Sequence, residues 1–350
     1  RDPHHGRLCG RDPRRRERSM TRQDEAHELT EKQLQALEKR VAKVYKEAKE
    51  NLDETVRAYF EGFRRRDEAM KKRLDAGEIT EDYYKQWRLN QIGRGKRFED
   101  LRDKLAERFT DAYETAVAYV NDKTPGIYSL NRNYAAYTIE KEVGDVGFTL
   151  WDEQTVKRLI VEEPDVMPYY PPKRAVQRGI DLAYGKSQIT KNVTSSILQG
   201  LSIGQMADSL QARVVTMSRV SAVRAARTAV TAAENAGRMD SYHAAEKMGI
   251  KLRKRWLSTL DGRTRHAHAI LDGQTVDVDK PFKVDGREIR FPGDPQAAPY
   301  LVYNCRCSLV ADVIGIPKDD TLRRDREGII PDMTFAQWQN TKRGERGLQR

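Results

Sequence analysis

The stretch that decides the fold of the C-terminal part of the chain runs from Trp256 to Cys307. It contains, in order, the motifs WLSTLDGRTRHAH (256–268), LDGQ (271–274), PGDP (292–295) and NCRC (304–307). Asp-Gly and Pro-Gly pairs favour tight turns, because glycine adopts positive φ at little cost. Residues 275–278 and 288–291 alternate apolar and polar side chains, which predicts short half-buried strands. The turns should therefore fold this stretch back on itself and bring its two ends together.

Two cysteines and two histidines in this stretch form a candidate metal site. Cys305 and Cys307 are one residue apart, so an extended backbone directs both thiols to one face, with Cα atoms about 6.5 Å apart. That spacing suits two thiolates on one zinc ion, with His268 as the third ligand and His266 or Asp261 as the fourth. Two other readings stay open: buried, unligated thiols beside a hydrogen-bonded histidine, and a redox or nucleophilic thiol.

The motifs of residues 256–307 resemble those of the phage Mu F-type head morphogenesis family, the minor head proteins of tailed phages. The upstream segments ART (226–228) and NAGR (235–238) fit this family as well. These pieces follow the family's order and spacing, and the resemblance covers roughly residues 190 to 312. The chain departs from the family at Ala229, where an acidic residue often follows the Arg-Thr pair.

The resemblance implies a structural protein of the phage head interior, made in the host bacterial cytoplasm. Its expected partners are the portal protein and the major capsid or scaffold proteins, and its expected role is head assembly. Some members of the family are thought to contact the packaged genome, so DNA, bound without sequence preference, is a further expected partner. No membrane partner is expected.

Two alternative functions remain beside this one. The first is an enzyme, either a metal-dependent hydrolase or the toxin-type transferase domain that is sometimes fused to this family. His266 and His268 beside Asp261 and Asp272 are similar to a hydrolytic metal site, but no general base stands out, so no enzymatic activity is expected. The second alternative is a non-specific DNA-binding protein.

The composition supports a helix-rich protein without a membrane span. Charged residues make up 33% of the 350 residues and hydrophobic residues 38%, as expected for long helices with much exposed surface. No run of 18 apolar residues or secretory signal is present. The net charge of +11 favours nucleic acid or acidic partners, although charges of alternating sign also suit solvated helix faces. Three cysteines do not form a disulfide framework, which indicates a reducing compartment.

The predicted fold class is α+β, with a long helical hairpin over residues 20–122. Apolar residues recur at three- and four-residue steps from Leu34 to Phe63, and again from Trp87 to Val120. Such an arm either is purely structural or docks its apolar stripe on a partner helix.

The remaining boundaries follow from changes in composition. Residues 1–19 are interpreted as a disordered leader or an added remnant before a start at Met20. Residues 123–188 form an aromatic-rich helical segment and a proline-rich link, with a boundary at the TPG motif of 124–126. Residues 189–312 form the Mu F-like domain, and residues 313–350 a tail with a small docking segment.

Overall fold

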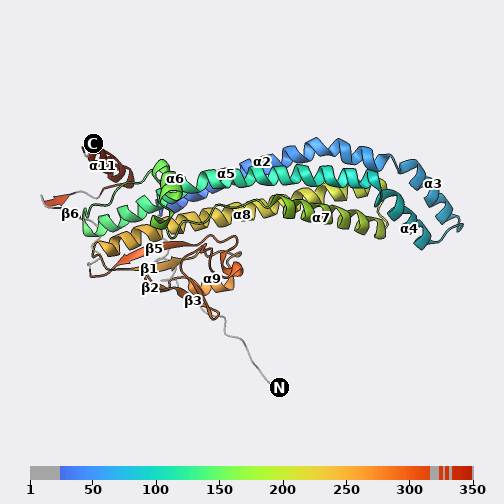
Figure 1. Ribbon diagram of the computed structural model, residues 1–350. Helices are drawn as coiled ribbons and strands as arrows, with labels where there is room; N and C mark the ends of the chain where they lie inside the picture. Colours follow the sequence, from blue (N-terminus) through green and yellow to red (C-terminus); the bar gives the residue numbers. More distant parts are fainter. Residues whose placement is uncertain (1–23, 316–322, 326–327, 331–332, 349–350) are drawn as a thin grey trace, which may run out of the picture.

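The computed structural model describes residues 24–315, 323–325, 328–330 and 333–348. Long helices form an elongated body, and a small antiparallel β unit packs beside one end of it (Figure 1). This arrangement confirms the predicted α+β class with its helical N-terminal and middle parts. The predicted leader, residues 1–19, lies outside the described residues.

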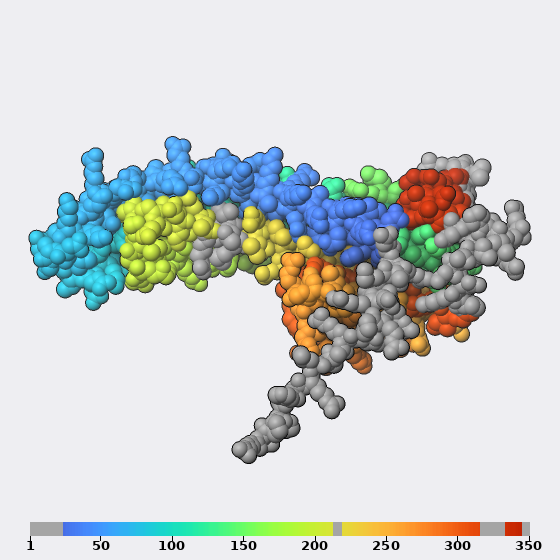
Figure 2. All heavy atoms as spheres, turned by 180° about the vertical axis from the view of Figure 1, so that it is seen from behind, coloured from blue at the N-terminus to red at the C-terminus, as the bar shows by residue number. Residues whose placement is uncertain are grey.

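Three helices run along the body and pack on one another. They are α2 (Glu25–Glu61), α5 (Lys96–Val143) and α8 (Ile203–Lys247). With a rise of about 1.5 Å per residue, α5 alone is about 72 Å long. The shorter helices are α3 (Arg64–Asp75) and α4 (Glu81–Ile92) at the far tip, α6 (Glu153–Glu162), the 3-10 turn η1 (Pro164–Val166) and α7 (Arg178–Leu198). Seen from behind, the β unit projects from the body at the end opposite this tip (Figure 2).

The apolar stripe of α2 lies in the core of the body. Leu34, Leu37 and Val41 are all buried, and α2 packs against both α5 and α8. The stripe is therefore an internal packing surface between helices of the same chain, and it is not exposed for docking on a partner helix.

The predicted hairpin is divided into shorter helices than the sequence suggested. The glycine pair at 93 and 95 separates α4 from α5, and the first half also breaks, at Gly62 and Phe63. There the aromatic rings of Tyr59 and Phe63 pack edge-to-face, with centroids 5.3 Å apart.

The boundary predicted at 124–126 is wrong as a helix break, because α5 continues through Pro125 to Val143. Proline lacks an N–H group and leaves the carbonyl four residues earlier, that of Asn121, without its helical partner. The Thr124 hydroxyl lies 3.1 Å from this carbonyl oxygen and replaces the missing donor. This hydroxyl allows the proline to lie inside a helix.

Helix α7 crosses the boundary expected between the proline-rich link and the Mu F-like domain. It begins at Arg178, before residue 189, although Gly179 and Gly185 have low helix propensity. Gly185 packs next to the Cβ atom of Ala106. Helix α8 is continuous from 203 to 247.

Helices α5 and α8 approach each other closely at Gly237. A Cβ atom built on this glycine would lie 2.4 Å from the Tyr128 carbonyl oxygen and 3.1 Å from the Arg132 nitrogen. Such distances exclude any larger side chain without a backbone shift. The glycine of the NAGR segment therefore sets the distance between the two longest helices.

A buried charged cluster fixes the start of α2 to the C-terminal part of α8. Arg238 donates to Asp24, with its Nη1 atom 2.6 Å from Oδ2, and to Asn131 of α5. His27 Nδ1 lies 2.8 Å from Glu234 Oε1. The attraction of the Glu234 carboxylate raises the pKa of His27 from 6.5 to about 9. We call these five residues the α2 anchor.

The α2 anchor should make stability depend on pH. A histidine whose folded-state pKa is raised contributes fully below its unfolded pKa of 6.5, and loses that contribution as pH rises through about 9. We expect the melting temperature to fall between these pH values, and to fall less in H27Q. The exposed His266 supplies the control H266Q, which should follow the parent. Parallel pH profiles for the parent and H27Q would contradict this account.

The β unit is built around a three-stranded antiparallel sheet in the order β2-β1-β5, formed by β1 (Leu252–Leu257), β2 (Thr275–Asp277) and β5 (Ser308–Val313). The hairpin of β3 (Phe282–Val284) and β4 (Arg287–Ile289) and the short helices α9 (His266–Leu271) and α10 (Pro299–Val302) complete it. The two-residue hairpin loop is Asp285-Gly286, with φ values of 52° and 68°. An Asp-Gly pair suits such a loop because both positions need positive φ.

The expected tail contains a helix that docks on the body. Beyond the paired strands β6 (Arg323–Asp325) and β7 (Gly328–Ile330), helix α11 (Phe335–Leu348) packs against α5. Trp338 is buried, and its Nε1 atom donates to Glu140 at 2.6 Å. The Lys342 ammonium group lies 3.2 Å from the same carboxylate. The docking segment predicted in the tail therefore binds within the chain, through Phe335 and Trp338.

Candidate functional site

Helix α8 holds the cysteine segment in place through three polar side chains on one face. Thr228 accepts a hydrogen bond from the backbone nitrogen of Asn304, and Thr231 donates to the Cys305 carbonyl oxygen at 2.7 Å. Asn235 donates to the Cys307 carbonyl oxygen and accepts from the nitrogen of residue 309. Steps of three and four residues place these side chains on the same side of a helix.

A second set of contacts places His268. Its helix, α9, follows the turn at 261–264 and directs the imidazole inward. The Ser258 hydroxyl donates to the His268 carbonyl oxygen at 2.7 Å and accepts from Trp256 Nε1 at 3.0 Å. The Trp256 ring meets the imidazole edge-to-face, with centroids 5.9 Å apart. The start and middle of the 256–307 stretch thus position this histidine.

The structure brings His268, Cys305 and Cys307 together. The Sγ atoms of Cys305 and Cys307 lie 3.7 and 3.3 Å from His268 Nδ1, and all three potential ligand atoms lie within 4.8 Å of one another. Each residue is at most 3% exposed. We call this group the Cys-His cluster. Of the described residues, no other group of three or more His, Cys, Asp or Glu side chains has this geometry.

The hydrogen bonds assign the tautomer of His268. Its Nε2 atom lies 3.0 Å from the Leu301 carbonyl oxygen, which can only accept, so Nε2 carries the proton. Nδ1 of the neutral ring therefore directs a lone pair at the two sulfur atoms. A histidine whose other nitrogen is anchored by a carbonyl oxygen is typical of a metal ligand.

The two thiols have different environments. Burial raises the pKa of Cys305 well above its usual value. The hydrogen bond from the Cys305 thiol lowers the pKa of Cys307, against the opposing effect of burial. The Cys307 backbone N–H also donates to the Cys305 sulfur at 3.3 Å. The Cys307 sulfur is thus the one better suited to carry negative charge.

The two residues predicted as a fourth ligand lie outside the cluster. Asp261 forms a two-fold ion pair with Arg306, at 2.6 and 2.7 Å, which holds the pKa of its carboxyl group far below the usual range. His266 is exposed, because two residues along a helix correspond to about 200° of rotation from His268. Asp272 accepts from the Ser258 nitrogen and caps a loop.

Sequence reasoning did not assign roles to Thr228, Thr231 and Asn235. The signal was present, because these polar residues recur at three- and four-residue steps on an alanine-rich helix. Nothing in the sequence, however, showed which segment their face would meet.

Comparison with known proteins identifies a family region that contains this site. Residues 187–310 match the family model described as Phage Mu protein F like protein. The matched region includes α8, which supports the cysteine segment, and the Cys-His cluster itself. Residues 187–310 therefore form a Mu F-like region of the chain.

Two curated relatives extend the similarity beyond the family region. The Mu F-like chain is 28% identical to Minor head protein GP7 of Bacillus phage SPP1 over 279 residues, which cover 76% of the chain and 86% of that protein. It is also 27% identical to NAD(+)--arginine ADP-ribosyltransferase EFV of Enterococcus faecalis, over 227 residues. That alignment covers 63% of the chain but 46% of the relative, so the chain spans about half of it.

No solved structure matches the chain. None of the helices in the described part of the chain combines the length and apolarity that a bilayer crossing needs.

Proposed function

We propose that this Mu F-like chain is a structural component of the phage head that associates with the portal and is needed for head assembly. One observation carries the proposal: the similarity to a minor head protein extends over 279 residues and 86% of that relative, well beyond the family region of 187–310. The family region has 124 residues, so an alignment of this length also includes part of the chain outside it. This length supports a role shared with a head protein.

The Cys-His cluster supports a structural role over an enzymatic one. Its three side chains are at most 3% exposed, so a substrate has no access to the thiols or the imidazole. Catalytic sites are usually clefts that admit a substrate. The transferase activity in the name of the Enterococcus relative is not carried over, because the alignment covers 46% of that protein.

Co-purification with the portal protein of the same phage tests the proposed association. The tagged full-length chain and the portal are expressed together, and the major capsid protein replaces the portal in a parallel capture. We expect the portal to be retained at a defined ratio through washes of moderate ionic strength. Portal recovery no higher than that of an unrelated protein would contradict the proposal.

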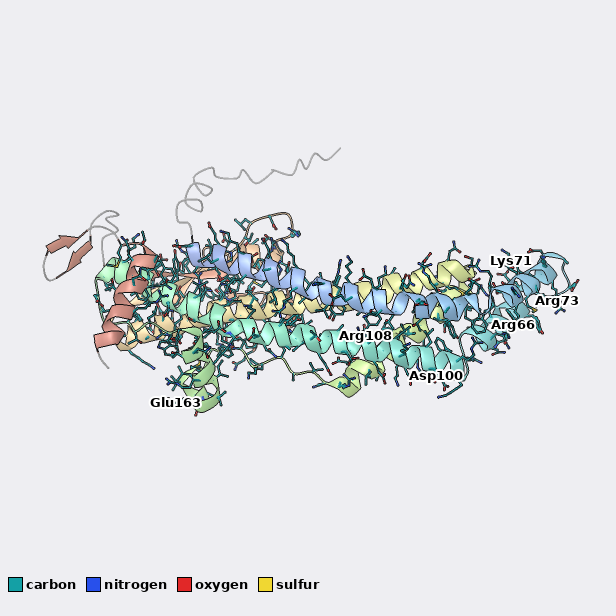
Figure 3. The ribbon with its side chains drawn as sticks, turned by 90° about the horizontal axis from the view of Figure 1, so that it is seen from above. Arg66, Lys71, Arg73, Asp100, Arg108 and Glu163 are labelled. Carbon is teal, nitrogen blue, oxygen red and sulfur yellow. The ribbon has the colours of Figure 1, made fainter. Side chains whose placement is uncertain are left out.

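A contact with packaged DNA is the second candidate function, and the charge of α3 favours it. This helix at the far tip contains six basic and three acidic residues. Figure 3 shows Arg66, Lys71 and Arg73 on the exposed tip. No ion pair involves Lys71 or Lys72 among the described residues. An exposed cluster of positive charge suits a phosphate backbone.

DNA binding of this kind should depend strongly on salt. We expect the logarithm of affinity to fall linearly with the logarithm of salt concentration, with a slope of about −0.9 per phosphate neutralised. The double variant K71E/K72E should bind more weakly and with a shallower slope. The control K43E/K46E makes the same charge change on the exposed face of α2 and should have a smaller effect. Affinity that does not respond to salt, or equal losses in both variants, would contradict a DNA contact at the tip.

A further inference from the structure

We propose that His268, Cys305 and Cys307 bind one zinc ion, which joins helix α9 to the segment entering β5. The inference does not depend on the proposed role in the phage head. It rests on the distances, the tautomer, the burial and the surroundings of the Cys-His cluster.

The distances suit a tetrahedral ion. Zinc binds thiolate at about 2.3 Å and imidazole at about 2.0–2.1 Å, which places two tetrahedral ligand atoms roughly 3.5–3.8 Å apart. The sulfur-to-Nδ1 distances of 3.3 and 3.7 Å are close to this separation, and all three atoms lie within 4.8 Å of one another. Small side-chain adjustments therefore suffice to bind the ion.

The surroundings of each ligand fit as well. The Leu301 carbonyl oxygen holds the proton on Nε2 of His268, which leaves Nδ1 free to bind a cation. The Cys307 backbone N–H donates to the Cys305 sulfur at 3.3 Å. A donor of this kind stabilises a thiolate, which is the form that binds metal. The Ser258 hydroxyl oxygen, 3.5 Å from the Cys307 sulfur, accepts from the thiol in the metal-free protein.

Charge balance favours a divalent ion at this buried position. Two thiolates and a neutral imidazole carry a charge of −2, which one Zn²⁺ neutralises. Two neighbouring thiolates without a cation would be costly at less than 4% exposure. Binding accordingly releases the thiol protons to solvent and changes no oxidation state. Sulfur and nitrogen ligands select zinc over the hard cations Mg²⁺ and Ca²⁺.

The fourth position is assigned to a water molecule. Asp261 forms an ion pair with Arg306, and His266 is exposed to solvent. Neither side chain therefore serves as the fourth ligand of the zinc ion. Ser258, whose hydroxyl accepts from Trp256 Nε1, is placed to hydrogen-bond a water on the metal. The site is then a cross-link between residues 37 positions apart in the chain.

Metal analysis of the reduced full-length chain tests the proposal. After growth with zinc, we expect about one zinc per chain. The variants C305A, C307A and H268A should lose most of it. H266A is a matched control on the same short helix, and C9S changes the chain's third cysteine; both should retain the parent's content. Equal losses in H266A or C9S would overturn the assignment.

A second measurement keeps the test independent of variants that fail to fold. The metal-free parent chain is titrated with Co²⁺ alone, under reducing conditions. We expect visible bands of tetrahedral cobalt, a near-ultraviolet thiolate-to-cobalt band and saturation at about one equivalent, with zinc displacing cobalt. A folded parent chain with less than about a tenth of an equivalent of zinc, and with no thiolate band on cobalt addition, would overturn the proposal.

Discussion

Replacing Arg238 by methionine should lower the free energy of unfolding by about 3–5 kcal/mol, because the variant leaves buried carboxylates without their partner. Arg238 is 2% exposed, and its guanidinium group lies 2.6 Å from Asp24 and 3.4 Å from Glu234. It also donates to the Leu309 carbonyl oxygen at 2.8 Å. One side chain thus joins α2, α8 and the β unit, and its loss should destabilise all three together. Chemical denaturation followed by circular dichroism measures the change.

The control for this prediction lies on the same helix. Arg224 is exposed on α8, and R224M should change stability by less than about 0.5 kcal/mol. Equal effects of R238M and R224M would show that the α2 anchor contributes little and that the buried carboxylates find other partners or protonate at low cost.

The variant G293A should lower the free energy of unfolding by roughly 2–5 kcal/mol. Gly293 has φ of 83°, which costs an L-residue about 1–2 kcal/mol. A Cβ atom at this position would also lie 2.7 Å from the backbone nitrogen of Ala232 on α8, and such overpacking costs about 1–3 kcal/mol more. The glycine of the PGDP motif therefore allows the β unit to contact α8 directly.

A variant at Gly286 separates the cost of positive φ from the cost of the steric overlap. It has φ of 68°, but no atom lies within 4 Å of a Cβ atom built there. G286A should therefore show the backbone term alone and be the milder variant in the same denaturation experiment. If G293A and G286A are equally stable, the close approach of the β unit to α8 is not present in solution.

The features that could be predicted from the sequence depend on local sequence patterns. The stripe from Leu34 to Phe63 predicted a long buried helix face, because periodicity depends only on neighbouring turns of one helix. The turn-forming pairs around residues 262 and 273 predicted that His268 would approach Cys305 and Cys307, and the structure places them together. Whether the three bind zinc stays a prediction.

The parts that could not be predicted depend on contacts between distant segments or on exact orientation. Arg238 and Asp24 are 214 positions apart, so no local pattern connects them. Pro125 was interpreted as a boundary because proline usually interrupts a helix. The hydroxyl of Thr124 compensates for the missing donor, and the rotamer that allows this is not visible in the sequence. His266 was predicted as a possible ligand, but the orientation of α9 exposes its side chain to solvent.

The protein composition of purified phage heads tests the central claim most directly. Heads are isolated from cells that carry the intact gene and from cells in which it is disrupted, and their proteins are quantified by mass spectrometry. We predict that the chain is present in the heads in few copies per portal, and that cells without it yield fewer complete heads. Absence of the chain from purified heads, despite expression in the same cells, would contradict its assignment as a structural component of the phage head.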